Sequence, residues 1–226
     1  MSRSIELSKH QWSPLHFITN GDTLEAQLRG AQMALAGGCR WIQLRMKEFS
    51  REQIVSVVLL LKPQCKQYNA VLIIDDHVDI ALEYQLDGVH LGLNDMPIDE
   101  ARVILGNDYI IGGTANTLAQ AQHQISCGAD YLGIGPYRFT STKKNLSPIL
   151  GIEGYASIVG ALGDNHIPIV AIGGIEIQDI MPIMATGVDG IAISGTILRA
   201  ENPIETTCNI LKKLDYERFN NCWSEI

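Results

Sequence analysis

Short apolar runs recur along the chain and alternate with longer amphipathic stretches. The runs span residues 15–19, 41–45, 70–76, 88–91, 109–114, 131–136, 167–174 and 190–194. They are too short for typical helices, rich in Ile and Val, and apolar at consecutive positions, as expected of parallel strands that are buried on both faces. The pattern therefore predicts about eight parallel strands.

The stretches between the runs have helical periodicity. Residues 23–36 are rich in Ala, Leu and Gln, and residues 51–66 carry apolar side chains at helical spacing. Small turns at 36–41, 84–89, 127–132 and 186–191 lead into the next run, and three of the four place Gly where a helix C-cap is expected. Without a Pro/Gly/Ser-rich linker, this alternation predicts one α/β domain over 1–226, with a core of about 14–213 and a tail at 214–226.

Two folds combine strands and helices in this way. A doubly wound sheet usually carries a Gly-rich phosphate fingerprint after its first strand, and residues 19–22 offer none. Polar residues instead follow many different strands, which is where a barrel builds its active site. Because 226 residues are also close to the ~250 of a typical barrel, we predict a single (β/α)8 TIM barrel.

Composition and charge restrict the class of protein. With 46% hydrophobic and 19% charged residues the chain has the balance of a globular protein, and a net charge of −8 argues against nucleic-acid binding. The five cysteines are scattered without metal-ligand or redox spacing, which favours reduced thiols. Residues 1–14 lack the apolar core expected of a signal peptide, and no apolar run approaches the ~20 residues of a membrane span. We therefore expect a cytoplasmic protein with no membrane partner; a homo-oligomer is compatible with the sequence.

Carboxylates follow two neighbouring strands of the predicted barrel. Asp75 and Asp76 end the third run, and Asp95 comes shortly after the fourth. Carboxylates without nearby His or Cys suit a hard cation, and Mg²⁺ is commonly held by one or two of them plus phosphate oxygens. For Asp76 alone, capping of the following helix is the competing interpretation. Acids on adjacent strand ends favour the metal site.

Cationic and hydroxyl side chains stand at other strand ends. Arg45 closes an apolar strand, where an unpaired charge is costly without an anionic partner, and Lys47 follows it. The long polar segment 135–151 contains Thr140, Thr142 and Lys143, which suit phosphate and leaving-group oxygens and have the setting of a lid. A structural carboxylate partner for Arg45, a solvated Lys47 and a plain surface loop are the alternatives.

The last two strand ends resemble the phosphate site of many barrels. Gly173–Gly174 and Ser194–Gly195 would present backbone N–H groups to an anion. The predicted rim thus has one cationic, metal-assisted anion site and one site made of amides, a set that suits a diphosphate and a monophosphate. Departure of diphosphate assisted by metal and cations is the simplest chemistry that this set supports.

Several motifs in order resemble the thiamine-phosphate synthase family over nearly all of residues 14–200. They are QLRMK (43–47), IIDD (73–76), DGVHLGLND (87–95), GGTANT (112–117), GADYLGIGP (128–136), FTSTKK (139–144) and AIGGI (171–175). The resemblance implies a cytoplasmic transferase of thiamine biosynthesis that joins a pyrimidine diphosphate to a thiazole phosphate with Mg²⁺. In the family, diphosphate leaves the pyrimidine methylene first, and the thiazole nitrogen captures the resulting cation.

The resemblance also implies roles for individual residues. Gln43, Arg45 and Lys47 would hold the pyrimidine diphosphate, with Asp75 beside them as a further substrate-binding residue. Asp76 and Asp95 would bind Mg²⁺. Thr114 would lie against the pyrimidine. Thr140 and Thr142 would face the thiazole phosphate, and Lys143 would neutralise the departing diphosphate. The phosphate group of the thiazole would be surrounded by Gly173, Gly174, Ser194 and Gly195. Arg45, Lys47 and Lys143 would be the catalytic residues.

Three positions depart from the family pattern. Asp75 stands where Asn is usual, Thr114 replaces Ser, and the family's Ser after the eighth strand falls at Gly195, one place beyond Ser194. Two alternatives are therefore a thiazole tautomerase-like barrel and a non-catalytic protein that binds thiazole phosphate or thiamine phosphate. His90 is interpreted as a buried supporting residue and His123 as a surface residue, not as acid–base catalysts.

Overall fold

Eight parallel strands close into a barrel in a computed structural model that describes residues 13–139, 148–163 and 166–223, the last eight by backbone alone. The strands are β1 (Leu15–Ile18), β2 (Trp41–Leu44), β3 (Val71–Asp75), β4 (Gly88–Leu91), β5 (Ile110–Ala115), β6 (Tyr131–Ile134), β7 (Ile169–Ile172) and β8 (Gly190–Ile193). They follow each other in sequence order, and β8 pairs with β1, with Phe17 opposite Ile193. The predicted barrel and each of its strands are confirmed.

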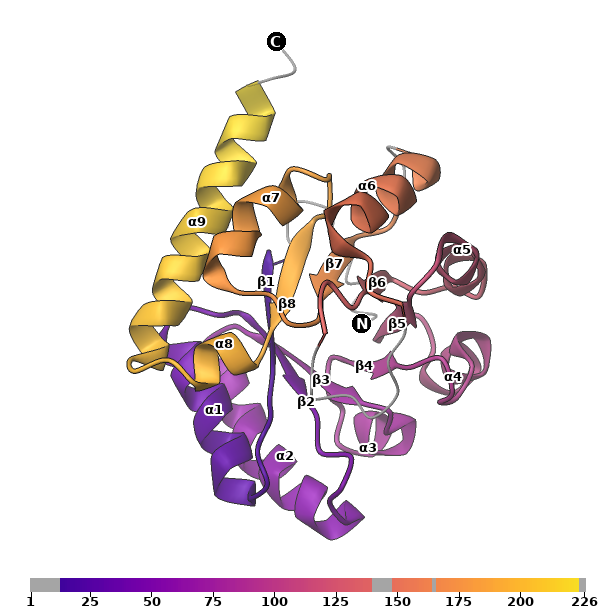
Figure 1. Ribbon diagram of the computed structural model, residues 1–226. Helices are drawn as coiled ribbons and strands as arrows, with labels where there is room; N and C mark the ends of the chain where they lie inside the picture. The colour runs from indigo at the N-terminus through magenta and orange to yellow at the C-terminus, as the bar shows by residue number, and fades with distance from the viewer. Residues whose placement is uncertain (1–12, 140–147, 164–165, 224–226) are drawn as a thin grey trace.

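Helices surround the barrel on the outside (Figure 1). They are α1 (Leu24–Ala36), α2 (Arg51–Gln67), α3 (Val78–Glu83), α4 (Ile98–Leu105), α5 (Leu118–Ser126), α6 (Gly151–Leu162), the 3-10 turn η1 (Ile177–Asp179), α7 (Ile180–Met184), α8 (Gly195–Leu198) and α9 (Pro203–Trp223). The two helices expected from periodicity begin at capping residues: Thr23 caps α1, and Ser50 with Gln53 forms a capping box on α2.

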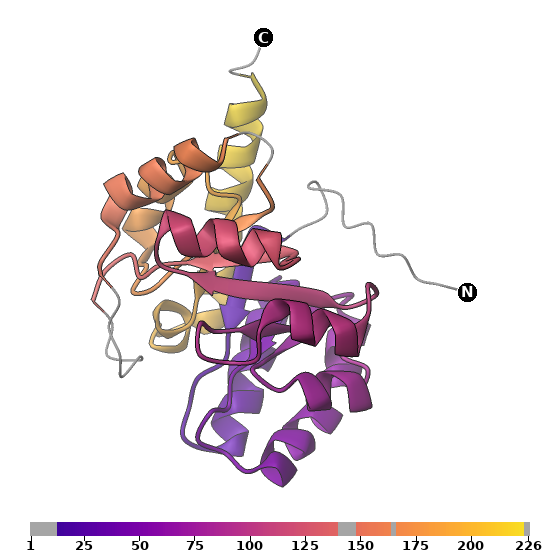
Figure 2. The ribbon, with the colours of Figure 1, turned by 90° about the vertical axis from the view of Figure 1, so that its right-hand side faces the viewer.

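The last helix runs past the rest of the chain. In Figures 1 and 2 the C-terminal part of α9 projects beyond the barrel. The helix continues through position 214, where the tail was predicted to begin, and Leu214 is fully buried. Among the described residues no helix is long and apolar enough to cross a membrane. Cys39, Cys65, Cys127 and Cys208 are free thiols.

Two apolar clusters hold the barrel together. The larger one fills the space between the strands and the helices, and the smaller one lies inside the barrel. The inner cluster contains Ile18, Trp41, Ile73, Ile110, Tyr131, Val170 and Ala192. Because strand side chains alternate between the two faces, the inward positions just beyond this cluster fall at the C-terminal rim. The rim therefore receives the polar side chains described below.

Tyr131 forms the floor beneath that rim. Its ring lies where a side chain at Gly112 would project, since a Cβ at that position would come 2.1 Å from the ring atom Cζ. The Tyr131 hydroxyl lies 2.8 Å from Nδ1 of His90, and the ring packs edge-on against Trp41 at 4.9 Å between centroids. A glycine on β5 thus allows an aromatic ring on β6 to reach across the barrel to β4.

Candidate active site

A buried pair begins the first polar cluster of the rim. Gln43 on β2 donates from Nε2 to Oδ1 of Asp75 at the end of β3, at 2.5 Å, and both side chains are almost fully buried. Nε of Arg45 lies 3.6 Å from Oδ2 of Asp75. Thr19, which was not selected from the sequence, holds the backbone of Arg45 in place, because its hydroxyl accepts from the Arg45 N–H at 3.0 Å.

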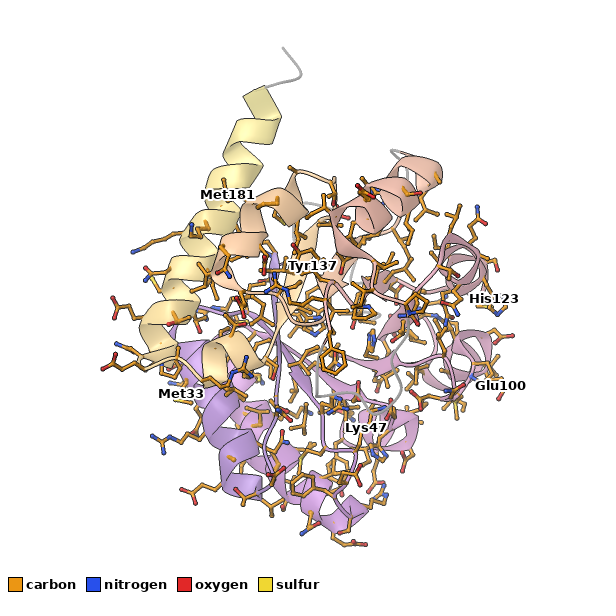
Figure 3. All side chains as sticks on the ribbon, viewed as in Figure 1. Met33, Lys47, Glu100, His123, Tyr137 and Met181 are labelled. Atoms are coloured by element: carbon orange, nitrogen blue, oxygen red, sulfur yellow. The ribbon has the colours of Figure 1, made fainter. Side chains whose placement is uncertain are left out.

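Lys47 connects three carboxylates. Its Nζ lies 2.7 Å from Oδ2 of Asp76, 3.5 Å from Asp75 and 4.0 Å from Asp95 (labelled Lys47 in Figure 3). Burial alone would lower the pKa of Lys47, but the charges of the three acids outweigh burial and raise this pKa. Of the predicted cations and acids, Arg45 and Lys47 are therefore brought together with Asp75, Asp76 and Asp95. Arg45 has the carboxylate partner that was one alternative, and Lys47 is ion-paired although its side chain is 40% exposed.

The backbone at Asp76 is in the left-handed region, with φ at 66°. This conformation is uncommon for a residue with a side chain and often accompanies function. Helix α3 begins after His77 and has no side-chain cap, so the competing interpretation of Asp76 as a helix cap is wrong. Oδ1 of Asp76 is buried, and no donor group of the described residues reaches it.

Asp76 and Asp95 lie close enough for their carboxyl groups to share a proton. Desolvation by burial, followed by the charge of Asp75, raises the pKa of Asp76 to about 7. Burial would also raise the pKa of Asp95, but its hydrogen bonds with Asp76 and with the backbone N–H of Gly92 lower it. The N–H of Gly92 donates to Oδ2 of Asp95 at 2.7 Å. The pair thus consists of one proton-binding and one ionised carboxyl group.

A hydrogen-bonded chain lies beside this cluster. Oγ1 of Thr114 is 3.0 Å from Nε2 of His90, whose Nδ1 meets the Tyr131 hydroxyl. All three side chains are buried. His90 is therefore the buried supporting residue that was predicted. His123, by contrast, is exposed on α5 at the periphery (Figure 3).

The second cluster surrounds a cavity of about 530 Å³ at the ends of β7 and β8. The predicted phosphate residues Gly173, Gly174, Ser194 and Gly195 all line it. Oγ of Ser194 is buried without a hydrogen-bond partner in the described part of the chain. Arg45 also lines this cavity, so the cation of the first cluster faces the second one.

Two further arginines line the cavity, and neither was selected from the sequence. Arg138 is held at 2.6 Å from Asp179 and 3.3 Å from Glu176. Arg199 follows the short helix α8 and reaches back over Gly195. An isolated Arg within a loop or after a helix carries no sequence signal for such a position, because only the fold brings it to the rim.

Thr140, Thr142 and Lys143 lie outside the described residues. Their neighbour Phe139 lines the cavity and is exposed. The roles predicted for these three residues, and the lid formed by their segment, stay predictions.

Comparisons with known proteins agree with this geometry. Residues 15–197 match the family model described as thiamine monophosphate synthase. A thiamine-phosphate synthase of Bacteroides fragilis is 57% identical over 87% of this chain and 98% of its own length. That of Flavobacterium psychrophilum is 45% identical over 90% of this chain and 100% of its own. A solved thiamine phosphate pyrophosphorylase of Pyrococcus furiosus superposes with a TM-score of 0.81 at 34% identity, over 91% and 96% of the two chains.

The family model spans most of the barrel, and the relatives match over nearly their whole length. Both comparisons therefore assign this chain to the same family. The chain belongs to the thiamine monophosphate synthase family.

Proposed function

We infer that this chain is a thiamine-phosphate synthase. It couples 4-amino-2-methyl-5-hydroxymethylpyrimidine diphosphate with 4-methyl-5-(2-phosphoethyl)thiazole to give thiamine phosphate and diphosphate. The single observation that carries this function, beside family membership, is that two polar clusters, each suited to an anion, meet at one rim. Arg45 belongs to both, because it pairs with Asp75 and lines the cavity at β7 and β8.

The first cluster suits the pyrimidine diphosphate. Arg45 and Lys47 offer charged donors to the diphosphate. The buried Oε1 of Gln43, which has no hydrogen-bond partner among the described residues, is an acceptor and would take a hydrogen bond from the pyrimidine amino group. In the absence of substrate the two cations are paired with acids, which keeps them in place. An arriving diphosphate can then share these donors without a large rearrangement. The hydroxyl of Thr114 would meet the pyrimidine, positioned by His90.

The donor set of the same cluster fits Mg²⁺. Asp76 and Asp95 are close enough to share a proton, and Oδ1 of Asp76 has no donor from the described chain. Within the described ranges no group of three or more His, Cys, Asp or Glu side chains could hold a metal alone. Mg²⁺ commonly takes one or two carboxylates and completes its shell with phosphate oxygens and water. When bound, the ion would neutralise charge that develops on the departing diphosphate.

The second cluster suits the thiazole phosphate. Gly173, Gly174, Ser194 and Gly195 line a cavity of about 530 Å³, within the range of small-ligand sites. The Ser194 hydroxyl, which is buried without a partner in the described structure, would donate to a phosphate oxygen. The phosphate would thereby anchor the thiazole with its ring nitrogen turned toward the pyrimidine methylene.

The chemistry then requires little from the protein beyond position and charge. The methylene C–O bond breaks and the diphosphate leaves with the electron pair, while the pyrimidine amino group stabilises the remaining cation. The lone pair of the thiazole nitrogen forms the new C–N bond. Arg45 and Lys47 would stabilise the leaving charge, and Lys143 is proposed to assist them from the segment beyond Phe139.

The test is diphosphate release from the purified protein with both substrates and Mg²⁺, repeated with each component omitted. Release that requires all three components, with thiamine phosphate formed in equal amount, is the expected result. Binding of thiazole phosphate without release would favour a sensor protein. Conversion of a thiazole tautomer without coupling would favour a tautomerase, and either outcome would refute the synthase.

A further inference from the structure

We propose that Arg199 is a specificity-determining residue that binds the phosphate group of the thiazole substrate. The proposal rests on the proposed function and deepens it by adding a charged side chain to the backbone amides and the Ser194 hydroxyl that were proposed to hold the thiazole phosphate. Arg199 lies beyond the segment that the family model matches, which ends at residue 197.

The position of the guanidinium group depends on Gly195. A Cβ at Gly195 would lie 2.1 Å from Nη1 of Arg199 and 2.8 Å from Cζ, so the group packs directly on the glycine backbone. The backbone N–H of Arg199 donates to the carbonyl of Gly195 at 2.9 Å, which holds the two residues together across one helical turn. The missing side chain at 195 therefore makes room for the charge of Arg199 at the cavity wall.

The charge of Arg199 is available to a ligand. Of the arginines that line the cavity, Arg138 is paired with Asp179 and Glu176, and Arg45 is paired with Asp75. Among the described residues no carboxylate or hydrogen-bond acceptor engages the Arg199 side chain, which is exposed.

The hydroxyl of the neighbouring Thr196 is not available to bind a phosphate in place of Arg199. Oγ1 of Thr196 already donates to the carbonyl of Ile175 at 2.6 Å. The remaining side-chain donor beside Gly195 is Ser194, whose Oγ has no partner in the described structure. Ser194 and Arg199 thus flank Gly195 with one neutral donor and one charged donor.

This combination selects a phosphate monoester. Such a group carries close to two negative charges at neutral pH, and an arginine fork can donate two parallel hydrogen bonds to it. A charge-assisted hydrogen bond at a ligand contributes about tenfold to a hundredfold in affinity. Because Arg199 lines the cavity at β7 and β8, which Lys47 does not line, it should act on the thiazole phosphate and not on the pyrimidine diphosphate.

The experiment compares the unaltered enzyme with the variants Arg199→Ala and Arg199→Lys. For each protein, kcat and the KM of each substrate are measured, and calorimetry gives the Kd for thiazole phosphate. Arg199→Ala should raise KM and Kd for thiazole phosphate at least about tenfold, with KM for the pyrimidine diphosphate unchanged. Arg199→Lys, which keeps the charge and loses the fork, should lie between. Lys213→Ala, which removes an exposed charge from α9, is the matched control and should match the unaltered enzyme.

A second variant tests the geometry without removing the charge. Gly195→Ala would collide only with the end of a flexible side chain, so the barrel folds and the guanidinium moves away. It should weaken thiazole-phosphate binding in the same direction as Arg199→Ala. Unchanged binding in Arg199→Ala, or an equal rise of KM for both substrates, would overturn the role of Arg199.

The two proposals fail in different ways. If the unaltered protein binds thiazole phosphate through Arg199 but never releases diphosphate, the synthase fails and the phosphate role of Arg199 stands. If coupling proceeds normally in Arg199→Ala, the synthase stands and the Arg199 proposal fails. Absence of any thiazole-phosphate binding by the unaltered protein would refute both.

Discussion

The ammonium group of Lys47 lies 2.7 Å from the carboxylate of Asp76, at a strand end where the backbone of Asp76 takes a left-handed conformation. The same ammonium is within 4.0 Å of Asp95. A protein cation therefore stands beside the acids proposed to hold Mg²⁺ and offsets part of their mutual repulsion. The second carboxyl oxygen of Asp76 has no donor from the described residues, so proton and metal would compete for this pair.

We predict that Mg²⁺ affinity falls as the pH decreases through neutrality. The pKa of Asp76 is raised to about 7, so its carboxyl group is ionised above that pH and protonated below it. Because the metal binds the ionised form, the dissociation constant should rise roughly tenfold between about pH 8 and about pH 6. Calorimetric Mg²⁺ titration across this range, with the pyrimidine diphosphate absent, measures the effect. A flat profile would exclude Asp76 as the linked group.

Asp75→Asn should move the pH dependence of Mg²⁺ affinity to lower pH. The charge of Asp75 is the second cause, after burial, of the raised pKa of Asp76. Asn keeps the size of the side chain, and its amide oxygen can still accept the hydrogen bond from Gln43. The same titration, repeated on this variant, should give a midpoint below that of the unaltered protein. An unchanged midpoint would show that the charge of Asp75 does not raise the pKa of Asp76.

Asp95→Asn should raise the Mg²⁺ concentration needed for half-maximal coupling by at least about tenfold, because one metal-binding charge is lost. The amide oxygen of Asn can still accept from the backbone N–H of Gly92, so the loop should stay in place. Circular dichroism melting would check the fold, and coupling rates across a Mg²⁺ series would give the requirement. If the Mg²⁺ series is the same for both proteins, Asp95 is not a metal ligand.

Thr114→Val should impair use of the pyrimidine diphosphate. Valine keeps the shape but loses the hydroxyl that lies 3.0 Å from Nε2 of His90. Loss of the hydrogen bond that this hydroxyl is proposed to make with the pyrimidine, about 1–2 kcal/mol, corresponds to a roughly 5–30-fold fall in kcat/KM for this substrate. Thr114→Ser keeps the hydroxyl and is the control, expected to retain most activity. Equal kcat/KM values for the two variants would show that the Thr114 hydroxyl does not bind the substrate.

The strand and helix pattern could be read from the sequence because it depends on local periodicity. Continuous apolar runs give buried parallel strands, and Thr23 and Ser50 mark helix starts through their own side-chain hydrogen bonds. The turn at 84–89 has no glycine at its helix end, and there Gln85 takes a positive φ of 48°. Glycine at the other turns was therefore a useful but not a necessary signal.

The sequence also predicted many of the described residues that meet at the rim, since parallel strands present their C-terminal ends together. It could not predict which partner each residue takes. Lys47 contacts three acids from two different segments, and one of them, Asp76, has a left-handed backbone conformation. Arg199 reaches the cavity only because Gly195 leaves space for it. Such contacts arise from packing between distant segments, for which local sequence carries no pattern.

The packing of Tyr131 across Gly112 gives a prediction about stability. Gly112→Ala should destabilise the barrel by roughly 3 kcal/mol or more, because the new Cβ would come 2.1 Å from a buried ring that cannot move aside. Gly160→Ala is the matched control: Gly160 lies on the exposed side of α6 with no atom within 4 Å of a new Cβ, so alanine should stabilise by about 0.5–1 kcal/mol. Urea unfolding of both variants measures the difference. If the two variants are equally stable, the Tyr131 ring does not lie over Gly112. The inference that Tyr131 supports His90 and Thr114 from below would then also be wrong.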